Sequence, residues 1–171
     1  MLKTTLIGLG LFAFSVPAAA AGGPTDPQIA HIAYTAGTID IAAAQQALAR
    51  SHNKAVRAFA QEMVRDHKAV NDKALALVKK LHVTPEANPT SAGLSKSAAA
   101  TLKRLSHLHG RALDRAYAEN EVAYHRTVNG ALSTTLIPSA NNAELKSLLS
   151  TGLALFQEHQ AHAEHLVKGL R

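Results

Sequence analysis

The chain has 171 residues, a formal net charge of +6 and no cysteine, and aromatic residues make up only 4% of it. The absence of cysteine excludes disulfides, thiolate metal sites, cysteine nucleophiles and covalently attached c-type haem. The positive charge favours anionic surfaces, yet the chain has no dense basic run and no tryptophan to stack on bases. We therefore expect no nucleic-acid partner.

The first 21 residues have the three parts of a secretory signal peptide. Lys3 gives the positive start, residues 6–16 the apolar stretch and residues 19–21 a small-residue cleavage site. The apolar stretch is shorter than the roughly 20 residues that a membrane-spanning helix needs. We expect export to the periplasm with cleavage near Ala21, and a mature domain over residues 22–171 without a transmembrane segment. An uncleaved membrane anchor, or a peripheral position at the outer membrane, is the alternative.

Two helices joined by a short break are predicted in the first half of the mature chain. Over residues 27–50 apolar side chains recur at helical spacing, and Asp40 falls inside their stripe. The stripe of residues 54–82 is the strongest in the chain, and it includes His67. Because only residues 51–53 connect the two helices, they should pack against each other in antiparallel directions.

The second half predicts a long loop and two more helices. Residues 84–94 hold two prolines and a glycine, which is typical of a loop. A third helix should run from about 95 to 132 with a bend or short break near Gly110. Asn141, three residues before a glutamate, is typical of a helix start, so a fourth helix is expected over 142–169. With no β signal in the sequence, we predict an all-α four-helix bundle, either up-down or ferritin-like with a long crossover.

Three of these apolar stripes contain a histidine, namely His67, His125 and His159, and the fourth contains Asp40. Neutral imidazole is the commonest metal ligand, and bundle metal sites are built from side chains on facing helices. Asp114 and Glu121 share a helix face with His125. The candidate metal ligands are therefore Asp40, His67, Asp114, Glu121, His125 and His159. A hydrogen-bonded polar core without metal explains the same pattern and is the alternative.

Helix geometry divides these candidates into two levels. Asp114 lies about 16 Å from His125 along their helix at 1.5 Å per residue, so the two cannot share one ion. Counting outward from a turn centred near residue 137 places His159 opposite Asp114. Counting from the first break places His67 opposite Ala36, which is one helical turn from Asp40. Glu121 and His125 are the further candidates at that level.

The side chain of Asp66, although next to His67, points about 100° away from it. We expect it to bond to a neighbouring helix or loop. The remaining histidines are expected at helix ends or in solvent. His162 and His165 lie off the core stripe of the last helix, where with Glu158 they form at most a weak surface site.

No motif in the sequence assigns an enzymatic reaction. Di-iron carboxylate proteins need Glu-x-x-His on two helices, and no glutamate here has a histidine three residues later. Haem between Met63 and a histidine of the last helix is disfavoured, because such a methionine is more often core filling. The chain also lacks Gly-x-Ser-x-Gly, His-Glu-x-x-His and a Gly-rich phosphate loop.

Three segments together resemble the exported bacterial DUF4142 family, a domain of unknown function. They are FAQEMVRDH at 59–67, Gly110 with LDRAY at 113–117 and His125, and His159 in the last helix. The resemblance covers about residues 27–169 and implies an all-α, ferritin-like bundle exported to the periplasm, with no established reaction. The family favours Phe where this chain has Leu113 and Glu where it has Asp40. The first change should alter packing only, and the second shortens a candidate ligand.

The leading interpretation is a periplasmic helical-bundle protein that acts as a binding or envelope-stress module. Its inward-facing histidines and carboxylates would hold a transition-metal ion, without enzymatic activity. A ferritin-like metal-dependent redox enzyme is one alternative, and a structural or interaction bundle without metal is the other. The expected partners are an envelope surface or a second copy of the chain.

Overall fold

The computed structural model describes residues 22–170, and the regular structure in this range is helical throughout. The long helices are α1 (Asp26–Arg50), α2 (Lys54–Lys80), α3 (Pro89–Ser106), α4 (Gly110–Ala131) and α6 (Ala143–Gly169). A π-helical turn, η1 (Leu132–Leu136), and the short α5 (Ile137–Ser139) continue α4. The all-α prediction is thus confirmed for the described residues, but five long helices replace the four expected. The predicted signal peptide lies outside the described residues.

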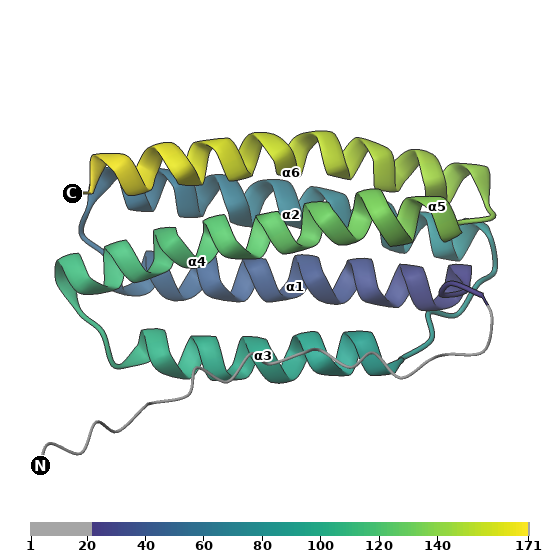
Figure 1. The fold of residues 1–171 in the computed structure, drawn as a ribbon, viewed down its shortest axis with the longest axis horizontal. Coiled ribbons are helices and arrows are strands. Elements are labelled where there is room, and N and C mark those ends of the chain that lie inside the picture. The colour runs from purple at the N-terminus through teal and green to yellow at the C-terminus, as the bar shows by residue number, and fades with distance from the viewer. Residues whose placement is uncertain (1–21, 171) are drawn as a thin grey trace, which may run out of the picture.

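Consecutive long helices run antiparallel along a common direction (Figure 1). α1 packs on α2, α2 on α6, α6 on α4 and α4 on α1. α3 packs mainly on α1, outside the other four helices (Figure 1). Because α3 returns the chain to the end where α2 begins, α2 and α4 run in the same direction. The connection between them is therefore a crossover that is itself helical.

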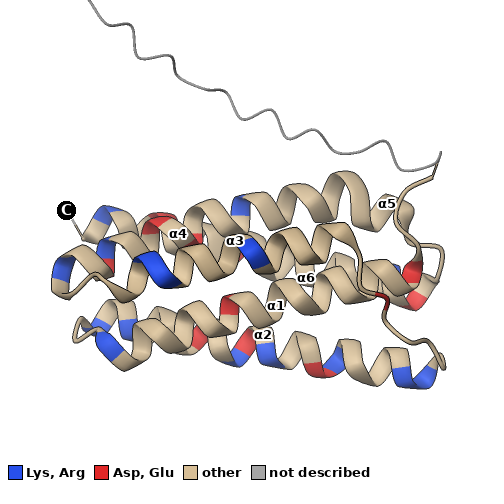
Figure 2. Cartoon of the chain, turned by 90° about the horizontal axis from the view of Figure 1, so that it is seen from below, with Lys and Arg blue, Asp and Glu red and all other residues tan. Residues whose placement is uncertain are grey.

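The start of α3 corrects the predicted loop over residues 84–94. The side chain of Asn88 accepts a hydrogen bond from the backbone N–H of Ser91, and Pro89 takes the first helical position. The proline that suggested a loop is therefore a helix-start residue. The interruption near Gly110 is confirmed in position but is a full reversal between two helices, and Gly110 has a φ of 51°. Basic residues precede and follow this reversal, with Lys103 and Arg104 in the last turn of α3 and Arg111 in the first turn of α4; Lys and Arg are blue in Figure 2.

Polar side chains of α1 hold α3 in place, since few residues of α3 are buried. Arg50 donates hydrogen bonds of 2.8 Å to the carbonyl oxygens of both Leu105 and Leu108. Gln46 donates one of 3.0 Å to the carbonyl oxygen of Leu102. Arg50 thereby satisfies carbonyl groups at the C-terminal end of α3, where helical partners run out.

The start of α6 lies one residue later than predicted and is tied to the start of α1. The side chain of Asn142, not Asn141, caps the helix by accepting from the backbone N–H groups of Glu144 and Leu145. The carboxylate of Asp26 accepts from the backbone N–H groups of Asn141 and Asn142, both at 2.9 Å. These bonds fix the chain reversal between α5 and α6 against the first turn of α1.

Two apolar clusters form the core, one on each side of a polar middle. The first contains Ala43, Ala44, Ala47, Val56, Phe59, Ala60, Met63, Tyr117, Ala118, Ala163 and Leu166. The second contains Ile29, Ile32, Leu132, Leu136, Ala140, Leu145, Leu149 and Phe156. On α1, α4 and α6 most buried polar residues fall between these clusters, namely Asp40, Glu121, His125, Asn129 and His159. No helix of the described chain is long and apolar enough to cross a membrane.

Candidate metal centre

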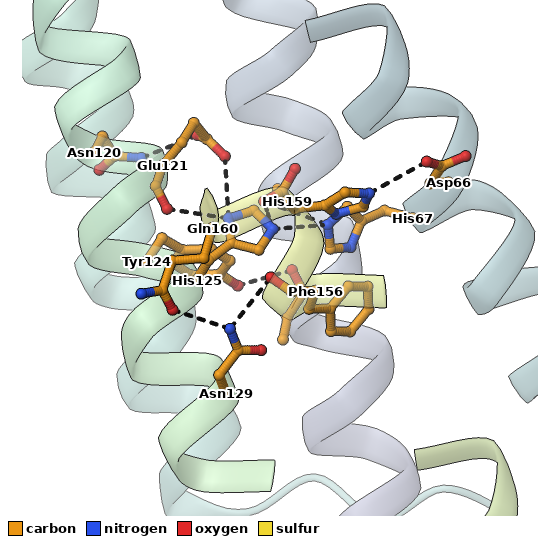
Figure 3. Close-up of polar contacts among 12 residues, drawn as sticks. Asp66, His67, Asn120, Glu121, Tyr124, His125, Asn129, Phe156, His159 and Gln160 are labelled. Carbon is orange, nitrogen blue, oxygen red and sulfur yellow. Dashed lines mark hydrogen bonds and ion pairs between the residues drawn. The ribbon is translucent and has the colours of Figure 1, made fainter. Parts of the chain in front are cut away.

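Each of the four core helices contributes to one buried polar group in the middle of the bundle (Figure 3). We call it the central cluster, and its members are Asp40 of α1, His67 of α2, Glu121 and His125 of α4, and His159 of α6. Each of these residues is at most 2% exposed. Five of the six candidate residues are therefore brought together, and Asp114 is not.

The three histidines of the central cluster form a nearly equilateral triangle. Their ring centroids are 5.4 to 5.5 Å apart, and each ring has a nitrogen within 4.8 Å of one in each of the others. Nε2 of His67 lies 3.4 Å from Nε2 of His125. Oδ2 of Asp40 lies 3.6 Å from the first of these nitrogens and 3.7 Å from the second. Donor groups of Asp40, His67 and His125 therefore face one another, and a nitrogen of His159 lies close to both of these imidazoles.

Hydrogen bonds on the outer side of two rings fix which nitrogen faces inward. Nδ1 of His125 lies 3.0 Å from the carbonyl oxygen of Glu121, which can only accept, so this nitrogen carries the proton. The lone pair of His125 is then on Nε2, facing Asp40 and His67. Nε2 of His159 lies 3.2 Å from the carboxylate of Asp66 and donates to it. The lone pair of His159 is left on Nδ1, which has no hydrogen-bond partner.

Asp66 is held in turn by the guanidinium of its neighbour. Nε and Nη2 of Arg65 donate to the two carboxylate oxygens at 2.7 and 2.9 Å. This contact, more than any other, holds the pKa of Asp66 below its ordinary value. The prediction that Asp66 bonds to a neighbouring helix is confirmed, since its partner His159 is on α6.

The ring of His67 is positioned by packing rather than by hydrogen bonds on its outer side. It stacks on Phe156 with the centroids 4.6 Å apart and the planes 10° from parallel. Its Nδ1 has no hydrogen-bond partner. Sequence reasoning placed Phe156 in the apolar stripe of the last helix, but no sequence signal indicated this stacking.

The carboxylates of the central cluster lack the partners that buried charges require. Neither oxygen of Asp40 accepts a hydrogen bond from an N–H or hydroxyl group, and Oε2 of Glu121 accepts none either. The carboxyl of Glu121, when protonated, is a donor beside Asp40, and this contact partly opposes the effect of burial on the pKa of Asp40. Burial raises the pKa of Asp40 to about 7. Burial, reinforced by the nearby Asp40 carboxyl, raises the pKa of Glu121 well above its ordinary value. A negative charge here is therefore costly unless a cation joins it.

Burial shifts the histidines in the opposite direction. It lowers the pKa of His125 to about 4 and that of His67 well below its ordinary value. The pKa of His159 is lowered too, again by burial. All three imidazoles are therefore neutral at pH 7, which is the form that binds a metal.

The predicted pairing of Asp114 with His159 is wrong. Asp114 instead accepts a hydrogen bond from the hydroxyl of Ser51, which directly follows the end of α1. The error comes from the turn, because η1 and α5 extend the helical path to Ser139 and the chain reverses over residues 140–142. This later reversal brings His159 opposite His125, about ten residues further along α4. The predicted contact between His67 and Asp40 is confirmed.

The family model described as "Domain of unknown function (DUF4142)" matches residues 13–166. The chain belongs to the DUF4142 family. The predicted resemblance is thus confirmed, and two of the histidines that carried it, His67 and His125, face each other in this DUF4142 protein. No curated protein and no solved structure matches the chain.

Proposed function

We propose that this DUF4142 protein binds one divalent transition-metal ion in the central cluster. The ligands would be Asp40, His67, His125 and His159, with Glu121 beside them. One observation carries the proposal. The carboxylate of Asp40 is buried without a hydrogen bond and faces two imidazole nitrogens from two other helices. Leaving it unpaired costs free energy that a bound cation would remove.

The separations between donor atoms suit a four-coordinate ion. Zinc lies about 2.0 to 2.1 Å from nitrogen and oxygen ligands, so the edges of its tetrahedron are about 3.3 to 3.4 Å long. The three measured edges among Asp40, His67 and His125 are 3.4, 3.6 and 3.7 Å. Three imidazoles and one carboxylate are typical ligands of zinc, cobalt and copper ions. We propose zinc as the ion that this set fits best.

The bonds that orient two of these rings also support a metal site. Metal-binding histidines commonly donate their second N–H to a carboxylate or a backbone carbonyl. His159 does so to Asp66, and His125 does so to the carbonyl of Glu121. A structural polar core needs no lone pair directed inward, whereas a ligand does.

The burial of the central cluster favours retention of the ion over catalysis. Its five residues are at most 2% exposed, so a substrate could reach the ion only after the helices separate. We therefore propose a binding role in the cell envelope, such as buffering a metal under stress. The signal-peptide pattern of residues 1–21 supports export, and the helical crossover between α2 and α4 supports a ferritin-like topology.

A ferritin-like redox enzyme is the second candidate, favoured by one observation. Glu121 has an unpartnered oxygen beside the cluster, and the buried hydroxyl of Tyr117, one turn away, has no hydrogen-bond partner either. A further carboxylate would suit iron or manganese better than zinc. The absence of Glu-x-x-His argues against the di-iron form of this chemistry.

Metal analysis of tag-free protein separates these functions. We expect one tightly bound equivalent of metal, lost in both His67→Ala and His125→Ala and retained in His165→Ala, whose histidine is exposed on α6. If the protein holds no metal after exposure to zinc, cobalt and copper, and both variants are merely less stable, the interpretation as a structural bundle without metal is supported instead. Oxygen consumption by the iron-loaded protein would move the assignment to the redox enzyme.

A further inference from the structure

A second group of metal-ligating side chains lies on the outer side of His159, between α2 and α6. We call it the outer cluster, and it consists of Glu62, Asp66, His159 and His162. Glu62 and Asp66 are one turn apart on α2, and the two histidines are one turn apart on α6. Two carboxylates therefore face two imidazoles across the contact of neighbouring helices.

The donor atoms of the outer cluster are already close together. Oε2 of Glu62 lies 2.8 Å from Nδ1 of His162, and Oδ2 of Asp66 lies 3.2 Å from Nε2 of His159. Glu62, Asp66 and His159 each offer a donor atom within 4.8 Å of the other two. The ring of His162 packs edge-on against Phe59 at 5.1 Å, which holds it over α2.

Solvent reaches the outer cluster but not the central one. The side chains of His162 and Glu62 are 46% and 29% exposed, that of Asp66 is 17% exposed and that of His159 is 1% exposed. His159 belongs to both clusters, with Nε2 on Asp66 and Nδ1 unpartnered (Figure 3). Exposure thus falls stepwise from His162 to the buried ring that the two clusters share.

We propose that the outer cluster is a second, weaker site for a divalent transition-metal ion, and that it passes the ion inward at His159. Two imidazoles and two carboxylates suit a borderline ion such as zinc or cobalt. The outer site stands independently of the central one, whereas the transfer step rests on the proposed function. An ion held by Nε2 of His159 leaves the ring proton on Nδ1. Transfer therefore requires that Nε2 release the ion and regain a proton, which it donates to Asp66, while Nδ1 loses its proton and binds the ion.

Arg65 keeps the outer site weak. Its guanidinium occupies both oxygens of Asp66, so an arriving ion must displace it or share the carboxylate. The side chain of Arg65 is 69% exposed and can move into solvent. Replacing it in Arg65→Gln removes this competing cation, so the outer site should bind metal more tightly.

The test is a titration of tag-free protein with cobalt(II), read by its absorption spectrum and by competition with a chelator. We expect two equivalents in the wild-type protein, one tight and one weak. In Glu62→Gln/His162→Gln the affinity of the weak equivalent should fall at least about tenfold, the smaller loss seen when a supporting contact is removed. The tight equivalent should persist but load more slowly. The matched control, Glu119→Gln/His52→Gln, removes an exposed carboxylate and an exposed imidazole that belong to neither cluster and should behave as wild type.

Failure of the outer site and failure of the central site give different results. A single tight equivalent in wild type, or equal titrations of wild type and Glu62→Gln/His162→Gln, would overturn the outer site. A single weak equivalent that persists in His67→Ala would support the outer site and overturn the central one. Two equivalents with unchanged loading rates in the double variant would overturn the transfer step. Circular dichroism checks that each variant is folded.

Discussion

Replacing Asp40 by asparagine should stabilise the metal-free protein at alkaline pH, although the residue lies in the core. The substitution keeps the shape of the side chain and removes its charge. Both oxygens of Asp40 are buried without hydrogen bonds, and burial raises its pKa to about 7. At pH 8 the metal-free protein must therefore hold an unpaired buried carboxylate, which the variant lacks.

The magnitude follows from the shift in this pKa. The ordinary value is 3.8, so the shift to about 7 corresponds to about 4 kcal/mol at 1.36 kcal/mol per pH unit. Between pH 4 and 7 the folded protein holds a proton on Asp40 that the unfolded chain has lost. The free energy of unfolding therefore falls as the pH rises through this window. The buried amide of asparagine costs about 1–3 kcal/mol if unpaired. We expect a net gain of about 1–3 kcal/mol at pH 8 and none near pH 4.

Urea unfolding followed by circular dichroism, with a chelator present, measures this difference at pH 8 and pH 4. The control is Asp72→Asn, whose carboxylate is 59% exposed and pairs with Lys68, and it should change stability by less than about 1 kcal/mol. With zinc added, the order should invert, because only the wild-type protein gains binding free energy. If metal-free Asp40→Asn is less stable than the wild-type protein at pH 8, the buried carboxylate of Asp40 does not destabilise the fold as expected.

Three further outcomes are expected. Asp66→Asn should weaken metal binding at the central cluster about 10- to 100-fold, because the amide no longer fixes the tautomer of His159. Unchanged metal affinity in a chelator competition would contradict this expectation. Zinc binding at pH 6 should release at least about one proton, because the raised pKa of Asp40 leaves it protonated there. Calorimetry in buffers of different ionisation enthalpy counts the protons released. A second proton, absent in Glu121→Gln, would come from Glu121, whose pKa is raised too, and release of no proton would contradict the expectation. Arg50→Ala should loosen the contact of α3 with α1 and speed amide hydrogen exchange in α3, since two hydrogen bonds to its C-terminal end are lost. The control Arg111→Ala, at the exposed start of α4, should leave hydrogen exchange in α3 unchanged.

The part of the site that could be predicted from the sequence depended on well-defined turns. The break between α1 and α2 is three residues long, so its register is fixed and the contact of His67 with Asp40 could be expected. The turn before α6 contains a π-helical segment, and no apolar period indicates where such a segment ends. The position of His159 was therefore displaced along α4, and its place in the central cluster could not be predicted.

The start of α3 was predicted six residues too late, and its separation from α4 was predicted only as a bend or short break. Asn88 and Pro89 can begin a helix or lie within a loop, and the sequence after them is rich in serine and alanine rather than in large apolar residues. α3 buries only Ser91 and Leu105, so no strong apolar stripe marks where the helix begins. What holds α3 in place is mainly Arg50 and Gln46 from α1, and such a tertiary contact leaves no periodic signal.

The most direct test of the central claim is anomalous diffraction at the zinc edge, from crystals of tag-free protein loaded with one equivalent of zinc. We expect a single dominant peak among Oδ2 of Asp40, Nε2 of His67 and Nε2 of His125, within about 2.0 to 2.2 Å of each atom. Zinc found only at exposed histidines such as His165, with no peak inside the bundle, would contradict a metal site in the central cluster.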